Sequence, residues 1–225
     1  MTPGFDAFAM PLAALAAVLL DRLLGETRRW HPLVGFGNLA GAIEKLLNQG
    51  SIAAGIVAWL ICVVPLIALA FWLRPFAPFV IDVVLLYFAL GAQSLCEHAA
   101  AIAKPLHDGR LDEARQRVGW IVSRETSQLD ASGVAKAGVE SVLENGNDAI
   151  FATLFWFALL GGPGALLFRL ANTLDAMWGY RTERYNLFGR CAARFDDALN
   201  WLPARLTALT YALLGETRQA FNCWQ

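Results

Sequence analysis

Three carboxylates in the middle of the sequence are spaced so that one helix face could present them to a cation. Glu140 and Glu144 are four residues apart, Asp148 follows four residues later, and Asn145 lies beside them. Like charges at this spacing are neighbours on a helix and destabilise it by about 0.2–0.5 kcal/mol per pair. Three aligned acids therefore favour a positive ligand, either magnesium with phosphate or an amine. The alternative is a solvated helix face.

A second polar group further along the chain mixes acids with arginines. Its members are Asn172, Asp175, Arg181, Glu183, Arg184, Asp196, Asp197, Asn200 and Arg205. Arginines hold phosphate or carboxylate through forked donors, and adjacent acids supply oxygen ligands for a hard cation. Interleaved arginines and acids also often pair with each other, so ligand binding and mutual pairing both remain open.

Several common motifs and classes are excluded. The sequence contains no Walker loop, no Gly-x-Gly-x-x-Gly dinucleotide motif, no Gly-x-Ser-x-Gly elbow and no His-Glu-x-x-His pair. The four cysteines are far apart and have no zinc-finger spacing. A net charge of −1 without a basic tract gives no electrostatic case for nucleic acid.

The elements that position these residues are apolar enough for a bilayer. Hydrophobic residues make up 57% of the chain and charged residues 16%, against about 45–50% and about 25% in soluble domains. We expect membrane spans at residues 8–24, 52–73 and 76–95, since a helix needs about 20 apolar residues to cross. The first is expected to be a retained helix and not a signal peptide, because residues 1–8 contain no Lys or Arg.

Within the third span, Asp82 should face a cavity or a partner, or else reach the interface. His31 is expected to be a capping or interfacial residue.

A fourth apolar run, residues 149–170, is cut by Gly161-Gly162-Pro163-Gly164 into pieces too short to span. We predict a re-entrant helical hairpin there, which would line a site. With this hairpin, the polar segments 97–148 and 172–205 would lie on the same side of the membrane. Their lysines and arginines predict that this side is cytoplasmic. The fold class is therefore all-α, a polytopic helical membrane protein of one domain with cytoplasmic polar helices.

Specific strings resemble the adenosylcobinamide-phosphate synthase family along nearly the whole chain. The matching strings are Asp21-Arg22-Leu23-Leu24-Gly25, His31-Pro32, Arg124-Glu125-Thr126-Ser127, Val139-Glu140-Ser141-Val142 with Glu144-Asn145 and Asp148, Asn172-Thr173-Leu174-Asp175, Gly179-Tyr180-Arg181, Glu183-Arg184-Tyr185, Asp196-Asp197 and Asn200-Trp201-Leu202-Pro203-Ala204-Arg205. Glu125 departs from the family, which more often has Asp there. The family also continues beyond the equivalent of Trp224, so we expect its C-terminal segment to be missing or replaced.

The resemblance implies ATP-dependent amide ligation of adenosylcobyric acid with aminopropanol phosphate or aminopropanol, in a bacterial inner membrane. A carboxylate condenses with an amine once its oxygen is a leaving group, so we expect an acyl phosphate held by magnesium and arginines. The implied cofactors are ATP and Mg²⁺, and the implied partners are the corrinoid, the amino alcohol phosphate, the bilayer and other cobalamin-assembly enzymes. A non-catalytic membrane sensor and a small-molecule transporter are the alternatives.

Site roles follow from the residue types and the resemblance together. The expected catalytic residues are Glu140, Glu144, Asp175 and Asp196. The expected metal ligands are Glu140, Glu144, Asp148 and Asp197. The expected substrate or phosphate ligands are Arg124, Arg181, Arg184, Arg205, Asn172 and Asn200.

Overall fold

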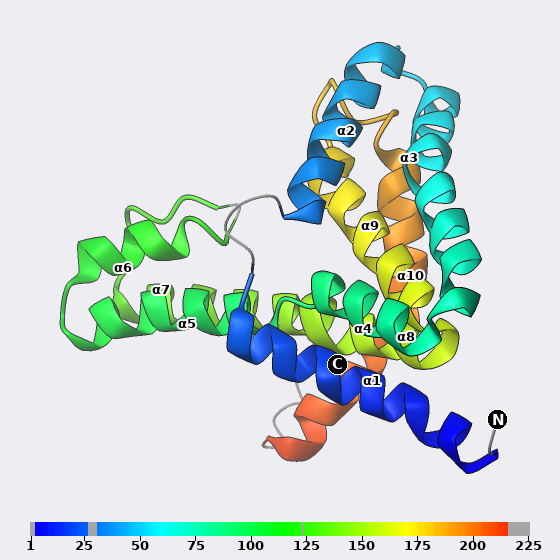
Figure 1. Cartoon of the computed structure of the whole chain (residues 1–225). Coiled ribbons are helices and arrows are strands. Elements are labelled where there is room, and N and C mark those ends of the chain that lie inside the picture. Colours follow the sequence, from blue (N-terminus) through cyan, green and yellow to red (C-terminus); the bar gives the residue numbers. More distant parts are fainter. Residues whose placement is uncertain (1–2, 27–30, 123, 216–225) are drawn as a thin grey trace.

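The computed structural model describes residues 3–26, 31–122 and 124–215, and within them the chain is all helical (Figure 1). The α-helices are α1 Pro3–Leu24, α2 Pro32–Leu47, α3 Ile52–Leu73, α4 Pro78–Ala89, α5 Ala92–His107, α6 Leu111–Val118, α7 Ala131–Gly146, α8 Thr153–Leu160, α9 Gly162–Trp178 and α10 Arg190–Leu214. A short 3₁₀ turn, η1 Arg74–Phe76, joins α3 to α4. A π-helical segment, η2 Asn147–Ala152, joins α7 to α8.

Two stretches of the described chain are long and apolar enough to cross a membrane, Ile52–Phe76 and Pro78–His107. The first contains the predicted span at residues 52–73, which forms the unbroken helix α3; that this helix crosses a membrane stays a prediction. The second overlaps the predicted span at 76–95, which stays a prediction, and it is interrupted where α4 ends at Ala89 and α5 begins at Ala92. At this interruption the backbone N–H of Gly91 donates to the carbonyl of Ala149 (3.2 Å), and so joins the stretch to η2. The run predicted at 8–24 is helical as part of α1, although it is not among these two stretches.

The predicted break in the fourth apolar run is confirmed as a helical hairpin. Helix α8 ends at Leu160 and is followed by Gly161, whose φ of 70° and ψ of −157° suit glycine, and α9 begins at Gly162. A Cβ on Gly161 would lie 2.4 Å from Nη2 of Arg74, so the tip of the hairpin touches the turn between α3 and α4. The hairpin therefore reaches the end of the bundle where those two helices meet.

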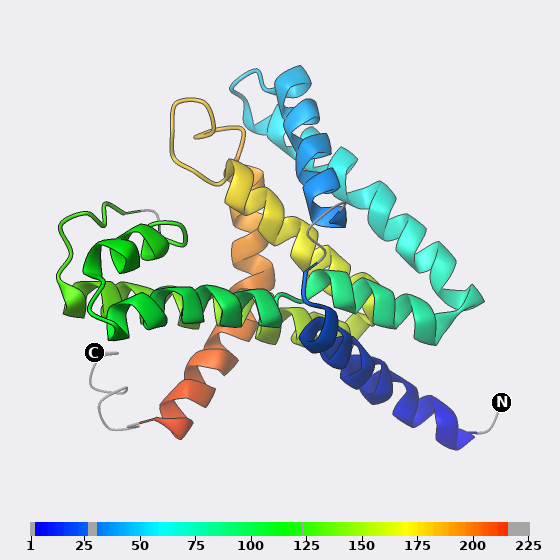
Figure 2. The ribbon, with the colours of Figure 1, turned by 60° about the vertical axis from the view of Figure 1, so that its left-hand side comes forward.

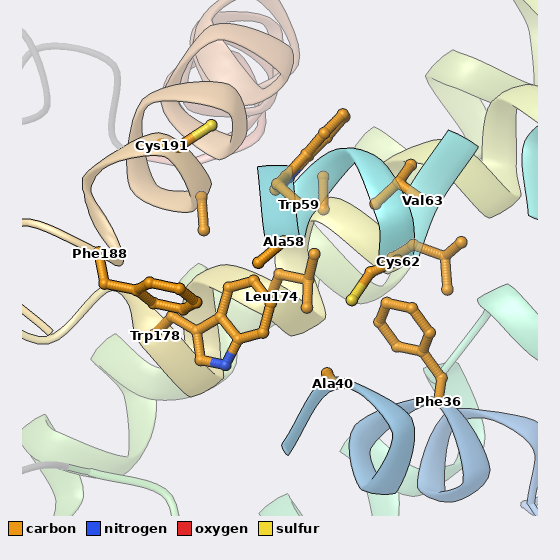
Figure 3. Packing of buried hydrophobic residues seen from close by; sticks show 13 residues of the cluster. Phe36, Ala40, Ala58, Trp59, Cys62, Val63, Leu174, Trp178, Phe188 and Cys191 are labelled. Atoms are coloured by element: carbon orange, nitrogen blue, oxygen red, sulfur yellow. The ribbon is translucent and has the colours of Figure 1, made fainter. Parts of the chain in front are cut away.

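The main hydrophobic core joins α2, α3 and α9 with the start of α10 (Figure 3). Trp178 of α9 packs against Phe188 edge to face, with ring centroids 5.1 Å apart, and both side chains are fully buried. Gly55 of α3 allows the chain to approach closely, because a Cβ there would lie 1.9 Å from the carbonyl oxygen of Phe188. This packing fixes the loop between α9 and α10 against α3.

Helices α5, α6 and α7 form a lobe to one side of the other helices (Figures 1 and 2). A separate small core holds the lobe together, with Val118 of α6 and Val134 of α7 fully buried and Ile102 of α5 nearly so. In Figure 2, α1 and α3 both extend away from this lobe toward the right-hand side. The lobe thus carries the acidic stripe of α7 at one end of the apolar helices.

Candidate functional site

The three aligned acids line one open cavity of about 820 Å³. Glu140 and Glu144 lie on α7, and Asp148 lies on the π-helical segment that continues it. The sequence-based prediction that they share one face is confirmed by their common place in the cavity wall. Single π-helical turns within α-helices occur frequently at functional sites. The cavity is also large enough for a small ligand or for part of a larger one.

Arg124 faces the acidic stripe from the segment that precedes α7. Its Nη2 lies 2.5 Å from Oε2 of Glu140, and both side chains are about half exposed. Lys136 approaches the other Glu140 oxygen at 3.9 Å. An exposed pair of this kind contributes about 0–1 kcal/mol, so a ligand can displace it at little cost. Arg124 and Glu140 are therefore available for binding.

Asp148 is held by side-chain amides from three other positions. Its Oδ1 accepts from Asn147 (2.8 Å) and Asn200 (2.7 Å), and its Oδ2 accepts from Asn172 (3.0 Å). Thr207 of α10 in turn donates to Asn147 (2.8 Å). A carboxylate has about four acceptor sites, so these bonds leave Asp148 little capacity for a ligand. Asn172 and Asn200, predicted to bind substrate, are engaged in fixing η2 against α9 and α10.

A second acidic group lies behind this network, on α9 and α10. Burial raises the pKa of Asp175, and the nearby charges of Asp197 and Asp148 raise it further. Burial, together with the charges of Asp175 and Asp148, raises the pKa of Asp196 to about 7. Asp196 is 8% exposed and accepts a long hydrogen bond (3.3 Å) from Asn172. A carboxyl group with a pKa near 7 can accept or donate a proton at neutral pH.

The three arginines of the signature block lie away from the cavity wall. Arg184 donates to both carboxylate oxygens of Glu44, at 3.0 and 2.5 Å. Arg205 stacks on Trp201, and Arg181 is exposed. Their predicted role in phosphate binding stays a prediction, but these positions do not favour it. Among the described residues, the arginines that line the cavity are Arg124 and Arg169.

In the described part of the chain, no group of three or more His, Cys, Asp or Glu side chains is arranged to hold a metal ion. Magnesium bound with a nucleotide needs one or two carboxylates plus phosphate oxygens. Glu140 and Glu144 could supply these from the cavity wall, whereas the predicted ligand Asp197 is not among the lining residues. The chemistry of the wall therefore fits a magnesium–phosphate complex better than a closed protein cage.

Several cavity residues are not among the predicted site residues, although Arg169 has a visible signal in the sequence. It is the one charged residue in the apolar run 149–170, where an ionisable side chain is by default a functional candidate. The other lining residues that were missed include Glu26, Ser94, His98, Trp120 and Tyr180. Glu26, Trp120 and Tyr180 are single residues on separate segments. Ser94 and His98 are four residues apart on α5, which gives only a short helical spacing and no longer pattern.

Three polar residues near the spans have structural partners. Nδ1 of His31 accepts from the N–H of Leu33 (3.2 Å) and caps α2, which confirms the capping interpretation. Asp82 pairs with Arg74, which confirms that a partner faces this acid. Asp21 accepts from the N–H of Gln93 (2.9 Å) and so ties α1 to the start of α5.

Together these features define the chain as a helical membrane protein with an acid- and arginine-lined cavity. The sequence profile of the CobD/Cbib protein family matches residues 14–225, and the chain belongs to this family. This confirms the resemblance to the adenosylcobinamide-phosphate synthases. No solved structure matches the chain.

Three relatives are each named "Cobalamin biosynthesis protein CobD". The protein of Chromobacterium violaceum is 55% identical over 93% of this chain and 70% of its own length. The protein of Stutzerimonas stutzeri is 55% identical over 95% of this chain and 73% of its own length. The protein of Rhodobacter capsulatus is 42% identical over 91% of this chain and 69% of its own length.

Proposed function

We propose that this chain joins adenosylcobyric acid to aminopropanol phosphate, or to aminopropanol, through an amide bond, with ATP supplying the energy. Membership of the CobD/Cbib family and relatives named for cobalamin biosynthesis support a role in that pathway. The motifs that resemble the adenosylcobinamide-phosphate synthases support this particular reaction. The observation that carries the proposal is the single cavity that collects Glu140, Glu144, Arg124 and Arg169.

These residue types suit the activation of a carboxylate. Arginines bind carboxylate and phosphate oxygens in a planar, forked geometry, and they stabilise negative charge that develops on those oxygens. Glu140 and Glu144 would hold magnesium, which when bound neutralises phosphate charge and orients the nucleotide. Asp196, with its pKa near 7, is placed behind Asp148 and could exchange a proton with the site through small movements of the amide network.

The location we propose is the bacterial inner membrane, with several crossings and the cavity facing the cytoplasm. In Figure 2 the lobe of α5, α6 and α7 lies on the left, whereas α1 extends to the right and α3 ends on the right, where it leads into α4. The tip of the hairpin contacts that end of α3, because a Cβ on Gly161 would lie 2.4 Å from Nη2 of Arg74. This arrangement supports a hairpin that enters and leaves the membrane on the same side. Most of the signature residues lie outside the two membrane-length stretches, whereas a transporter places its key polar groups within spans.

A labelling experiment tests this topology. Cysteines introduced at Arg115 and Arg184 should both resist an impermeant thiol reagent in intact cells, and both should react after permeabilisation. A cysteine at the predicted opposite side, in place of Phe76, is the matched control and should react in intact cells. If Arg115 and Arg184 differ in their labelling, the re-entrant hairpin is wrong.

The activity is tested by incubating purified protein with cobyric acid, ATP, magnesium and aminopropanol phosphate, and following the product by mass. The expected product has the mass of the two substrates minus one water, and it should require ATP. A non-catalytic sensor would bind a ligand without forming this product. Formation without ATP would reject the ligase mechanism.

A further inference from the structure

Arg169 occupies an unusual position for a charged side chain. It lies on α9 among apolar residues, and its guanidinium is almost wholly enclosed by protein. Its Nε is fully buried and has no hydrogen-bond partner in the described part of the chain. The residue as a whole remains partly exposed because the side chain ends at a cavity.

This side chain stands where two cavities meet. The larger cavity holds the acidic stripe, and the second, of about 680 Å³, lies near His31 and Leu33. The two walls share three residues, Glu26, Ser94 and Arg169. Gly91 also lies at this junction, since a Cβ on it would lie 3.8 Å from both Nη2 of Arg169 and Oε1 of Glu26.

An enclosed guanidinium without a full set of partners is costly. Removing a charge from water costs several kcal/mol, and hydrogen bonds or an opposite charge must offset this penalty. Glu26 attracts Arg169 but forms no ion pair with it within 4 Å, and Asp148 is already held by three amides. Within the described residues Nε of Arg169 has no hydrogen-bond partner, so the guanidinium can take an oxyanion that enters from either cavity.

We propose that Arg169 binds an oxyanion, a carboxylate or a phosphate, of a substrate at the junction of the two cavities. The assignment to these substrates rests on the proposed function, because a ligation requires two substrates to meet at one point. The carboxylate would come from the corrinoid acid, and the phosphate from ATP or the amine phosphate. In either case Arg169 would fix the oxyanion while the second substrate approaches from the other cavity.

The test combines binding with stability in detergent-solubilised protein. Cobyric acid is followed by its colour in equilibrium dialysis, and inorganic phosphate by calorimetry. Arg169→Met should weaken binding of at least one of these probes by about 10–100-fold, as for a lost hydrogen bond to a charged group. The same variant should melt no lower than the wild type, because it removes an unpaired buried charge. Arg110→Met, which alters an exposed arginine at the start of α6 and outside the cavity wall, is the control and should bind both probes normally.

Arg169→Lys provides a second reading, because it keeps the charge and loses the planar fork. It should fold and bind the affected probe about tenfold more weakly. If only cobyric acid binding is lost, the ligand of Arg169 is the corrinoid carboxylate. If only phosphate binding is lost, its ligand is a phosphate. If both are lost, the two groups share the site.

Four results would overturn the proposal: unchanged binding in Arg169→Met, unchanged binding in Arg169→Lys, failure of Arg169→Met to fold, or a wild type that binds neither probe. The proposed function can fail separately. A wild type that binds a probe through Arg169 but forms no amide product would retain this site and reject the ligase activity. If the wild type forms the amide product while Arg169→Met binds both probes normally, the ligase activity would stand and the Arg169 site would be rejected.

Discussion

The carboxylate of Asp82 accepts a 2.8 Å hydrogen bond from the backbone N–H of Gly162, the first residue of α9. The N–H groups at a helix start have no partner within the helix, and the helix dipole favours negative charge there. Asp82 also receives two 2.9 Å bonds from Arg74. One buried acid thereby attaches the tip of the hairpin to α4 and to the turn before it.

Asp82→Asn should destabilise the protein without changing the affinity for substrate. The variant keeps an acceptor for Gly162 but removes the charge that Arg74 neutralises, which costs about 1–3 kcal/mol. For a chain of this size we expect a fall in melting temperature of about 2–4 °C per kcal/mol.

Double-mutant analysis checks the mechanism of this loss. Arg74→Gln combined with Asp82→Asn should cost less than the sum of the single changes, because each single change leaves one charge unpaired. Additive losses would mean that the ion pair does not hold the hairpin.

Glu144→Gln should reduce turnover by about tenfold or more while leaving the melting temperature within about 1 °C of the wild type. Glu144 lies in the cavity wall and is exposed, so its charge serves a ligand more than the fold. Asp112→Asn is a suitable control, because this side chain is 95% exposed on α6 and does not line the cavity. Equal losses of turnover and of folded protein in Glu144→Gln would instead indicate a structural role.

Arg184→Lys distinguishes the two roles that the sequence leaves open for the signature arginines. A phosphate ligand predicts a raised KM for ATP or for the amine phosphate with an intact fold. The bidentate contact with Glu44 predicts a lower melting temperature and unchanged KM values, since Lys cannot reproduce the fork. We expect the second outcome. Steady-state kinetics and a melting curve on one preparation decide between them.

Glu44 should make the fold sensitive to acid. Hydrogen bonds from Arg184 hold the pKa of Glu44 below its ordinary value of 4.5, although burial opposes this. The folded state therefore favours the carboxylate, and the resulting stability is present above pH 4.5 and lost as pH falls through the lower folded pKa. Glu44→Gln should melt lower than the wild type at pH 7, with the difference shrinking toward pH 3. A difference that is constant with pH would rule out this linkage.

The sequence by itself determined the all-helical class, the continuous apolar helix at residues 52–73, the hairpin break at Gly161 and the shared face of Glu140, Glu144 and Asp148. These features depend on local physics, because apolar run length, glycine conformation and helical spacing act within about 20 residues. The family motifs are likewise local strings. Their order along the chain was sufficient for the resemblance.

The tertiary structure decided which partner each polar residue has. Three contacting pairs are far apart in the sequence. The separation is 52 positions for Asp148 and Asn200, 140 positions for Glu44 and Arg184, and 80 positions for Asp82 and Gly162. Such pairings depend on how whole helices pack, so spacing alone could not separate a ligand-binding arginine from one that neutralises an acid. Arg169 becomes prominent for the same reason, since its burial and its place between two cavities exist only once α9 is packed.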